Sequence, residues 1–507
     1  MSAIRPSFSS NIVKILVGLS ILVAAALLAL VFRPLSIIFE TPLSEDGFYM
    51  LAVSRYVALG QGITIDGQHL TNGFQPLFAA IMVPIYWLAN EDRYTSLRGV
   101  LFMHWLSHIG TALLLGRIAS AYLRHEKPIT QQMAFGSVTL LWLASRHVII
   151  NSYNALETGL VMFFEALVWY LYQRNWRDGW RLNLFGIALG LMVLARIDAV
   201  FLVVLLAGFE LLRNDEVSYR RLSRAARFSI IAGLVSSPWW LFNVIGFGSL
   251  MPTSGSAQSQ PFSPDRLKPM FEALLQNAVP YVHWSGIDGT PKTVLQTVVV
   301  LMIIALFIKT YRPINIAIHD NNNHIAIVML LFMVTLAAYY VATSFAYYFY
   351  MRYLSPFMLI AVVITGITLA SLPRITLLLL PIYAALALIA MLSVYRYCTQ
   401  LGESSNKNYT DQYALIQANV PPDQMVSAGQ SGTLGYFRDH VLNLDGKVNQ
   451  EALNYRGRIW AYLDAEKINW YCDWSTIWIE PNPETRGWKL VGRKGYFMLY
   501  QRVPPLQ

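Results

Sequence analysis

Long apolar runs, separated by short polar segments, fill the chain as far as about residue 397. Each run is about as long as a helix needs to cross the roughly 30 Å hydrocarbon core of a bilayer. Apolar and polar residues do not alternate within the runs, so the pattern favours transmembrane helices over the strands of a β-barrel. The first run is followed by no small-residue cleavage site and is interpreted as a retained signal-anchor helix. We predict an all-α polytopic bundle of eleven spans at residues 12–32, 99–122, 130–150, 158–173, 182–195, 199–212, 228–246, 293–309, 325–345, 354–371 and 375–396.

The segment 74–89 is also apolar, and whether it crosses the bilayer decides the orientation of every later span. Two prolines interrupt it and Tyr86-Trp87 lie near its end, which is typical of a helix in the membrane interface. In that arrangement thirteen basic loop residues share the side of the N-terminus. They are Arg124, Lys127, Arg174, Arg177, Arg181, Arg213, Arg220, Arg221, Arg224, Arg227, Lys309, Arg312 and Arg374. The positive-inside rule therefore predicts interfacial helices in the first outer loop, a cytoplasmic N-terminus and an extracytoplasmic tail.

The polarity changes after about residue 397, where the apolar runs stop and Asn, Asp, Gly and Pro become frequent. We therefore predict two domains, a transmembrane domain over residues 1–397 and a soluble extracytoplasmic domain over residues 398–507. The segments that begin at Trp488 and Gly495 are rich in β-formers and predict a closing hairpin. A small α/β domain is the expected fold of the tail.

Composition and charge narrow the class of protein. Hydrophobic residues make up 55% of the 507 residues and charged residues only 13%, about half the share of a soluble protein. The net charge of +9 comes from basic residues in short loops between apolar runs, which indicates a bilayer partner and not a nucleic acid. Cys398 and Cys472 form no metal or redox motif, and the sequence leaves open a disulfide or two unpaired thiols.

Candidate chemistry begins in the first outer loop, where Glu45 and Asp46 head an amphipathic stretch that includes Tyr49. Carboxylates suit a helix N-terminus, so capping is one interpretation. The other is a general base at the outer membrane surface, with its pKa brought nearer the working pH by partial desolvation. Further along, Asn72-Gly precedes Gln75-Pro, which predicts a turn into the interfacial helix.

Ionisable residues also stand at the outer ends of later spans, where their burial is costly and suggests function. Glu157 heads an apolar helix, either as a dipole partner or facing the first-loop carboxylate across a cavity. Arg196 and Asp198 are two residues apart and would not share a helix face, so we expect Arg196 to be free for a phosphate or to snorkel. Arg352, beside Tyr353, is a second candidate phosphate ligand or an interface anchor.

Taken in order along the chain, these motifs resemble the GT-C superfamily of membrane glycosyltransferases. Within it they are most similar to the branch that contains bacterial arabinofuranosyltransferases, and the resemblance spans nearly the whole chain. The motifs are Glu45-Asp46-Gly-Phe-Tyr49, Gly60-Gln-Gly, Thr71-Asn72-Gly73-Phe, Pro76-Leu, Leu156-Glu157-Thr, Leu194-Ala-Arg196, Arg352-Tyr353-Leu-Ser-Pro, Gly432-Thr-Leu-Gly435-Tyr436-Phe and Asn443-Leu-Asp445-Gly446.

The resemblance implies an inverting transfer of a sugar from a polyprenyl-phosphate donor to a cell-envelope glycan, glycolipid or protein. The sugar would be a pentofuranose such as arabinofuranose, and the reaction would occur on the periplasmic side of a bacterial inner membrane. The implied base is Asp46 or its neighbour Glu45, with Glu157 as the second acidic residue. The implied substrate-binding residues are Arg196, Asp198, Arg352, Tyr353, Asn72, Gln75 and Tyr49.

Three further expectations complete the prediction. Relatives often carry His where this chain has Gln75, which puts acid–base work at that position in doubt. No cofactor is required, although some relatives need a divalent metal at the paired carboxylates. The alternative function is a transporter or flippase of lipid-linked sugars, which the absence of two comparable halves disfavours. We expect the soluble domain to shape the choice of acceptor.

Overall fold

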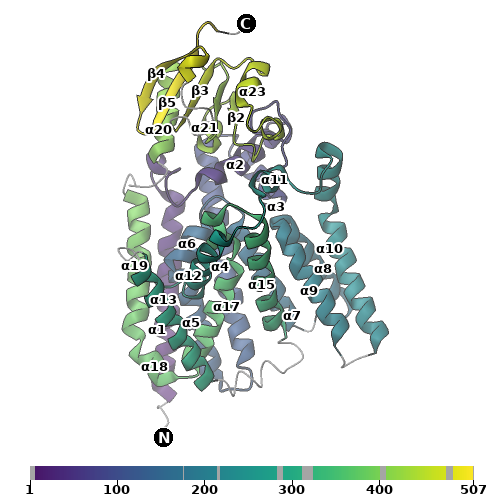
Figure 1. Ribbon diagram of the computed structural model, residues 1–507. Helices are drawn as coiled ribbons and strands as arrows, with labels where there is room; N and C mark the ends of the chain where they lie inside the picture. Colours follow the sequence, from purple (N-terminus) through teal and green to yellow (C-terminus); the bar gives the residue numbers. More distant parts are fainter. Residues whose placement is uncertain are drawn as a thin grey trace.

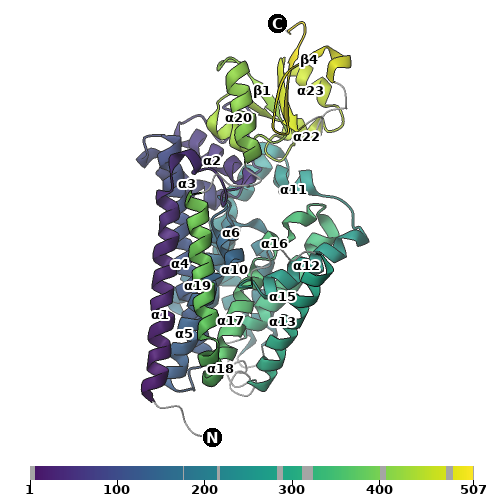
Figure 2. The same ribbon diagram turned by 90° about the vertical axis from the view of Figure 1, so that its left-hand side faces the viewer.

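The computed structural model describes residues 6–174, 176–213, 217–282, 289–310, 324–399, 407–474 and 483–505. A bundle of helices carries a small mixed-sheet domain at one end, and the N-terminus lies at the opposite end (Figures 1 and 2). This is the mostly helical architecture with a soluble tail that the apolar runs predict. Arg312, one of the thirteen basic residues that orient the predicted topology, lies outside the described residues.

The helices of the bundle follow the apolar runs closely. They are α1 (Pro6–Leu28), α2 (Glu45–Ala58), α3 (Pro76–Leu88), α4 (Arg93–Tyr122), α5 (Pro128–Ala144), α6 (Arg146–Ser152), α7 (Thr158–Gln173), α8 (Gly179–Ala195), α9 (Val200–Leu212), α10 (Ser218–Phe247), α11 (Thr253–Gln258), α12 (Leu267–Ala278), α13 (Thr290–Lys309), α15 (Ile325–Thr343), α16 (Tyr350–Tyr353), α17 (Pro356–Ala370), α18 (Pro373–Leu378) and α19 (Leu380–Thr399).

Six of these helices are long and apolar enough to cross a membrane, namely α1, α4, α10, α13, α15 and α19. Two bent pairs, α5 with α6 and Tyr347–Tyr353 with α17, raise the number of candidate spans among the described residues to eight. The three other predicted spans coincide with α7, α8 and α9, which have 16, 17 and 13 residues. All eleven predicted spans therefore fall on helices, of which six to eight qualify by length and composition.

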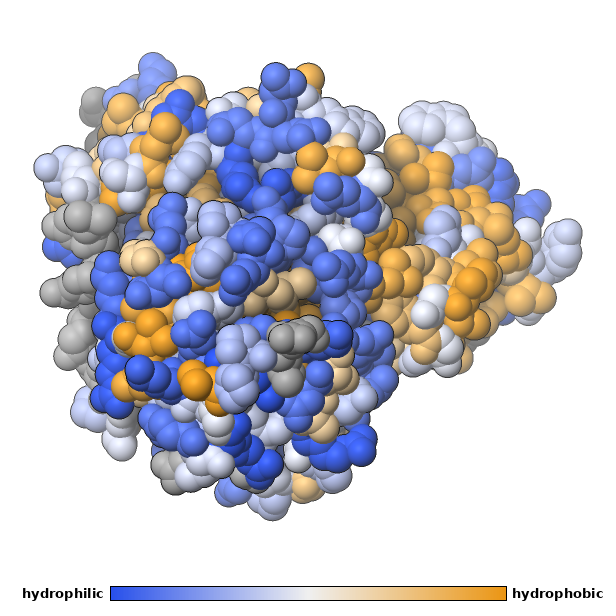
Figure 3. Space-filling view, turned by 90° about the horizontal axis from the view of Figure 1, so that it is seen from above, coloured by the Kyte–Doolittle hydropathy of each residue, from blue (hydrophilic) through white to orange (hydrophobic). Residues whose placement is uncertain are grey.

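The outer faces of the helices carry the apolar surface that lipid requires. On α10, Ile230, Leu234, Leu241 and Ile245 are each more than half exposed. Seen from the tail end, the domain in front is mostly hydrophilic, whereas a lobe beside it, where Figure 1 has α8 to α10, is mostly hydrophobic (Figure 3). Large exposed apolar faces of this kind are stable against hydrocarbon and not against water.

Helices α2 and α3 lie at the end of the bundle that carries the tail domain (Figures 1 and 2). Helix α3 has only 13 residues, and the hydroxyl of its Tyr86 donates to that of Tyr436 in the tail domain at 3.1 Å. The segment 74–89 thus contains a short helix attached to the tail domain, in keeping with the predicted interfacial position.

The tail domain is a five-stranded sheet with helices. Its elements are α20 (Lys407–Asn419), β1 (Val426–Ala428), α21 (Gly432–Phe437), β2 (Val441–Asn443), α22 (Gln450–Asn454), α23 (Ile459–Ala465), β3 (Trp470–Trp474), β4 (Trp488–Lys494) and β5 (Phe497–Arg502). The strand order is β2-β1-β3-β5-β4, with β1 parallel to both β2 and β3. Strands β4 and β5 form the predicted closing hairpin. Cys398 and Cys472 are free thiols.

The tail domain is fixed to the first outer loop by charged groups and by close backbone contact. Asp439 pairs with Arg55 at 2.9 Å and with Arg93 at 2.8 Å. At Gly73 the backbones meet so closely that an added Cβ would lie 1.9 Å from the carbonyl oxygen of Lys447. Glycine is therefore required at this position for the observed docking.

Gly73→Ala is expected to loosen the tail domain, because the methyl group and the Lys447 carbonyl cannot occupy the same space. Overpacking of this kind costs about 1–3 kcal/mol. The thermal midpoint in detergent and the rate of proteolysis at the tail would report the loss. Gly233→Ala is a matched control, since nothing lies within 4 Å of its added Cβ. Equal midpoints for the two variants would contradict the expectation.

A charged cavity beneath the tail domain

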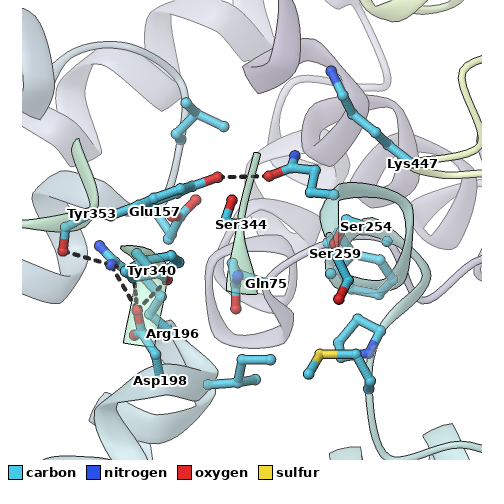
Figure 4. A pocket seen from close by; sticks show the side chains of 18 of the residues that line it. Gln75, Glu157, Arg196, Asp198, Ser254, Ser259, Tyr340, Ser344, Tyr353 and Lys447 are labelled. Carbon is cyan, nitrogen blue, oxygen red and sulfur yellow. Dashed lines mark hydrogen bonds and ion pairs between the residues drawn. The ribbon is translucent and has the colours of Figure 1, made fainter. Parts of the chain in front are cut away.

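A cavity of about 480 Å³ lies where the loop between α1 and α4, the ends of α7 to α9 nearest the tail domain, and the tail domain itself meet (Figure 4). Eight of the ten predicted site residues line it: Asp46, Tyr49, Gln75, Glu157, Arg196, Asp198, Arg352 and Tyr353. They come from segments separated by about 300 residues of sequence. The fold thus brings both predicted acids and both predicted arginines to one cavity.

Asp46 lies in the first turn of α2 and faces a lysine that the sequence analysis did not single out. Its Oδ1 is 3.2 Å from Nζ of Lys447, which also lies 3.4 Å from Oδ2 of Asp445. Burial acts to raise the pKa of Asp46, but the ammonium of Lys447 and the guanidinium of Arg352 outweigh burial and lower the pKa below its ordinary value. Asp46 is therefore ionised at neutral pH.

Glu157 immediately precedes α7 and is buried at the cavity wall. Its side chain makes no capping hydrogen bond to α7. In Figure 4 it lies beside Tyr353 and near Ser344 and Gln75. Its negative charge acts on both Arg196 and Arg352. Glu157 therefore partly offsets the positive charge of these two arginines in the cavity.

Arg196 lines the cavity, but the expectation that its guanidinium is free is wrong. Its Nε and Nη2 donate to Oδ2 of Asp198 at 3.0 and 2.7 Å. Nη2 also donates to the carbonyl oxygen of Tyr353 at 2.8 Å, and Nη1 donates to that of Arg352 at 3.3 Å. The spacing rule for helix faces does not apply, because Arg196 is extended (φ −159°, ψ 122°) and Ile197–Ala199 forms a 3₁₀ turn. Arg196 thus clamps α16 to the end of α8.

Arg352 also lines the cavity and, unlike Arg196, has donor capacity left for a ligand. Its guanidinium lies over the rings of Phe349 and Tyr353, with centroid distances of 4.6 and 5.3 Å. Its Nε is buried with no hydrogen-bond partner among the described residues. A buried donor without a partner is costly and is satisfied readily by an anion. Arg352 therefore fits the predicted role of a phosphate ligand better than Arg196 does.

Glu45 does not line the cavity, although its neighbour does. It is buried and accepts hydrogen bonds from the backbone N–H groups of Gly432, at 2.5 Å, and Thr433, at 2.9 Å, and from the Thr433 hydroxyl. Burial raises the pKa of Glu45 to about 7, against the opposing effect of these hydrogen bonds. Its carboxylate binds the start of α21 and so anchors the tail domain.

Asn72 also lies outside the cavity lining. Its amide nitrogen donates to Oδ1 of Asn243 at 2.9 Å, and its amide oxygen accepts from the backbone N–H of Thr253 at 2.9 Å. Asn72 thus joins the first outer loop to α10 and α11. Gln75 does line the cavity, and its Oε1 is buried without a partner among the described residues.

The residue that sequence reasoning missed is Lys447 in the tail domain. It follows the motif Asn443-Leu-Asp445-Gly446, which was noted for its resemblance and not for chemistry. Gly446 turns the chain with φ +77°, and the N–H of Lys447 donates to Oδ1 of Asp445 at 2.8 Å. This turn directs the lysine side chain into the cavity, so the motif itself was the available signal.

One group among the described residues has donor atoms close enough for a metal ion: His69, Glu451 and Glu466, all within 4.8 Å of one another. It joins the first outer loop to the tail domain and does not include Asp46 or Glu157. Nδ1 of His69 is 2.7 Å from Asp66, which raises the pKa of the imidazole. The raised pKa favours the charged imidazole, whose Nε2 lies 3.7 Å from both Glu451 and Glu466, so an ion-pair network accounts for this group.

The fold and cavity define a polytopic membrane protein whose soluble domain closes a charged site. No protein-family model and no curated protein sequence matches this chain. Among solved structures, it resembles ArnT from Cupriavidus metallidurans bound to undecaprenyl phosphate, with a TM-score of 0.62 and 12% identity over 95% of this chain and 98% of that chain. The apo state of that ArnT gives a TM-score of 0.57 at 12% identity, over 96% and 98% of the chains.

The chain also resembles an oligosaccharyltransferase from Archaeoglobus fulgidus, in complex with Zn and sulfate. The TM-score is 0.53 and the identity 12%, over 94% of this chain and 72% of that chain. ArnT and the oligosaccharyltransferase are GT-C membrane glycosyltransferases. At this identity the likeness is one of fold, and this chain resembles the fold of ArnT.

Proposed function

We propose that this protein is a GT-C glycosyltransferase that transfers a sugar from a polyprenyl-phosphate donor to a hydroxyl acceptor. The observation that carries the proposal is the cavity in which Asp46, Glu157, Arg352 and Lys447 meet at the tail end of the bundle. It supplies both a carboxylate for the acceptor proton and cations for the phosphate. The crystal structure of ArnT, which shares the fold, holds undecaprenyl phosphate.

The proposed reaction forms a bond between the acceptor oxygen and the anomeric carbon while the bond from that carbon to the phosphate oxygen breaks. The acceptor proton passes to Asp46, which acts as general base. The electron pair of the broken bond goes to the phosphate, which changes from a diester to a monoester and gains one negative charge. Arg352 contacts that phosphate and stabilises the developing charge. Glu157 stabilises positive charge on the sugar ring.

Tyr353, Gln75 and Tyr49 complete the proposed substrate site. The Tyr353 hydroxyl donates to Gln258 at 2.9 Å, which fixes the ring against the cavity. Gln75 offers an amide with a buried oxygen that lacks a partner among the described residues and suits a sugar hydroxyl. We assign Arg196 and Asp198 to holding the wall that positions Arg352, and Glu45 and Asn72 to docking of the tail domain.

The finer part of the proposal concerns the substrate and the side of the membrane. The motif resemblance to the arabinofuranosyltransferase branch supports a pentofuranose donor and a cell-envelope glycan, glycolipid or protein acceptor. The distribution of loop arginines supports a bacterial inner-membrane protein with its cavity on the periplasmic side. The tail domain supplies Lys447 and Val448 to the cavity, which supports a part for this domain in both acceptor choice and chemistry.

Purified protein in liposomes, supplied with radiolabelled polyprenyl-phosphate pentofuranose or hexose and a cell-envelope acceptor fraction, tests the function. We expect label to leave the lipid, with equimolar release of polyprenyl phosphate. Label that crosses the bilayer while still attached to lipid would support the transporter alternative. Donors of the two sugar classes, compared in parallel, test the pentofuranose assignment separately.

A further inference from the structure

The tail domain places one positively charged side chain inside the cavity. Lys447 is mostly buried, with 17% of its side chain exposed, and lies between Asp46 and Asp445. The side chain of Asp445 is fully buried, and that of Asp46 is 18% exposed. Two carboxylates thus share one ammonium, and the more accessible of the two is the proposed base.

The backbone that carries Lys447 is held firmly, whereas its ammonium stands at the end of a four-carbon stem with several rotatable bonds. Asn443 fixes the turn, because its Oδ1 accepts from the N–H of Gly446 at 3.2 Å and its Nδ2 donates to Ser431 at 2.9 Å. The Lys447 carbonyl packs against Gly73. The ammonium is therefore the movable part of a fixed segment, and a lysine carries three donors on a flexible stem.

We propose that Lys447 is a shared cation of the site, which neutralises Asp46 in the empty cavity and turns to the phosphate when the lipid-linked donor binds. This inference rests on the proposed function and adds a residue and a sequence of events to it. Donor binding brings one negative charge within reach of the ammonium, and departure of the phosphate adds a second. Asp46 is released from its ion pair at the stage when a base is needed.

The chemistry explains why such an arrangement is useful. A carboxylate held by an ammonium is a weak base, because the cation stabilises its ionised form. Once the ammonium binds phosphate, it no longer stabilises the ionised form of Asp46, and the basicity of Asp46 rises. Transfer is thereby coupled to the presence of the donor. The tail domain, which carries Lys447, becomes part of the catalytic site and is more than an acceptor platform.

Other titratable groups near Asp46 and Lys447 set the background for a pH test. They are Glu45, Tyr49, Tyr348, Arg352, Tyr353, Tyr409 and Asp445. Burial raises the pKa of Tyr49 and that of Tyr409 above the ordinary value of 10.0. The tyrosines therefore do not titrate at acid pH. Glu45, with a pKa of about 7, is common to all the variants compared.

The test compares wild type with Lys447→Gln, Lys447→Arg and the control Lys494→Gln. Lys494 is an exposed lysine of the same domain, 3.8 Å from Asp411 and remote from the cavity lining. Because Lys447→Gln leaves buried Asp445 without its cation, Asp445→Asn/Lys447→Gln is measured as well. Thermal midpoints establish that each variant is folded.

The first readout is the affinity for undecaprenyl phosphate, with undecaprenol as the ligand that lacks the phosphate. Lys447→Gln should weaken binding of the phosphate by about 10- to 100-fold, the range for loss of a charged hydrogen bond, and leave undecaprenol unaffected. Lys447→Arg should remain within a few-fold of wild type. Equal losses in both variants would assign Lys447 to packing and overturn the proposal.

The second readout is the pH profile of kcat/KM, which reports the free enzyme. The base must be ionised, so activity falls as pH drops through the pKa of Asp46. Removing Lys447 should raise that pKa and move the acid limb upward by about one pH unit or more. The inference would be overturned if Lys447→Gln and Asp445→Asn/Lys447→Gln both kept the wild-type acid limb and the wild-type affinity for undecaprenyl phosphate. Wild-type protein that neither transfers sugar nor binds undecaprenyl phosphate would instead defeat the proposed function.

Discussion

Replacing Asp46 by asparagine is expected to lower the rate of sugar transfer by about 10²- to 10⁴-fold, the usual contribution of a general base. Asparagine has nearly the same shape and cannot take the acceptor proton. Lys447 keeps Asp445 as a partner, so the tail domain should stay docked. The measurement is the initial rate of transfer of labelled sugar from a polyprenyl-phosphate donor, with saturating acceptor.

The affinity for the lipid provides an internal check on the same variant. In Asp46→Asn the phosphate no longer competes with the Asp46 carboxylate for Lys447. Undecaprenyl phosphate should therefore bind at least as tightly as it does to wild type. Asp411→Asn, at a carboxylate near the surface of the tail domain, is the matched control and should retain full activity. Transfer by Asp46→Asn within about tenfold of wild type would remove Asp46 as the base.

The fold was predictable from sequence because hydrocarbon imposes a simple length rule. A span needs about 20 apolar residues, and every run that meets this rule coincides with a helix or a bent helix pair. The closing hairpin was predictable because β-formers flank a short turn at Gly495. Both inferences use local sequence patterns, which can be recognised without knowledge of the tertiary contacts.

The acidic pair in the first outer loop marks the limit of such local reasoning. Glu45 and Asp46 are adjacent, and successive residues of a helix point about 100° apart. Only one of them can face the cavity, and the sequence alone does not say which. The deciding fact is the docking of α21 against Glu45, a contact between residues more than 380 positions apart.

The sequence did not single out Lys447 either, and the reason is a different one. An ionisable residue inside an apolar run attracts attention because its burial is costly, whereas a lysine in a soluble domain is ordinary. Its significance comes from the position of the tail domain over the cavity. The motif before it was noted only for its resemblance, and the structure shows that its turn brings Lys447 to the cavity.

Replacing Arg196 by methionine is expected to destabilise the bundle strongly. Removing a residue that only binds substrate would have no such effect on stability. The pair with Asp198 is buried, with 4% and 7% of the side chains exposed. Breaking such a pair leaves an uncompensated charge and costs about 3–5 kcal/mol. The Tyr340 hydroxyl, which donates to Asp198 at 2.5 Å, cannot replace the charge. The thermal midpoint in detergent measures the effect.

The double variant Arg196→Met/Asp198→Leu separates a scaffold from a substrate ligand. It removes both charges, so a large part of the lost stability should return, because replacing a buried ion pair by apolar residues is often neutral. Affinity for undecaprenyl phosphate should return with it if Arg352 is the phosphate ligand, since α16 is again supported. A variant with the wild-type midpoint and a persistent loss of lipid affinity would instead make Arg196 the phosphate ligand. The double variant therefore decides between a clamp and a binding residue.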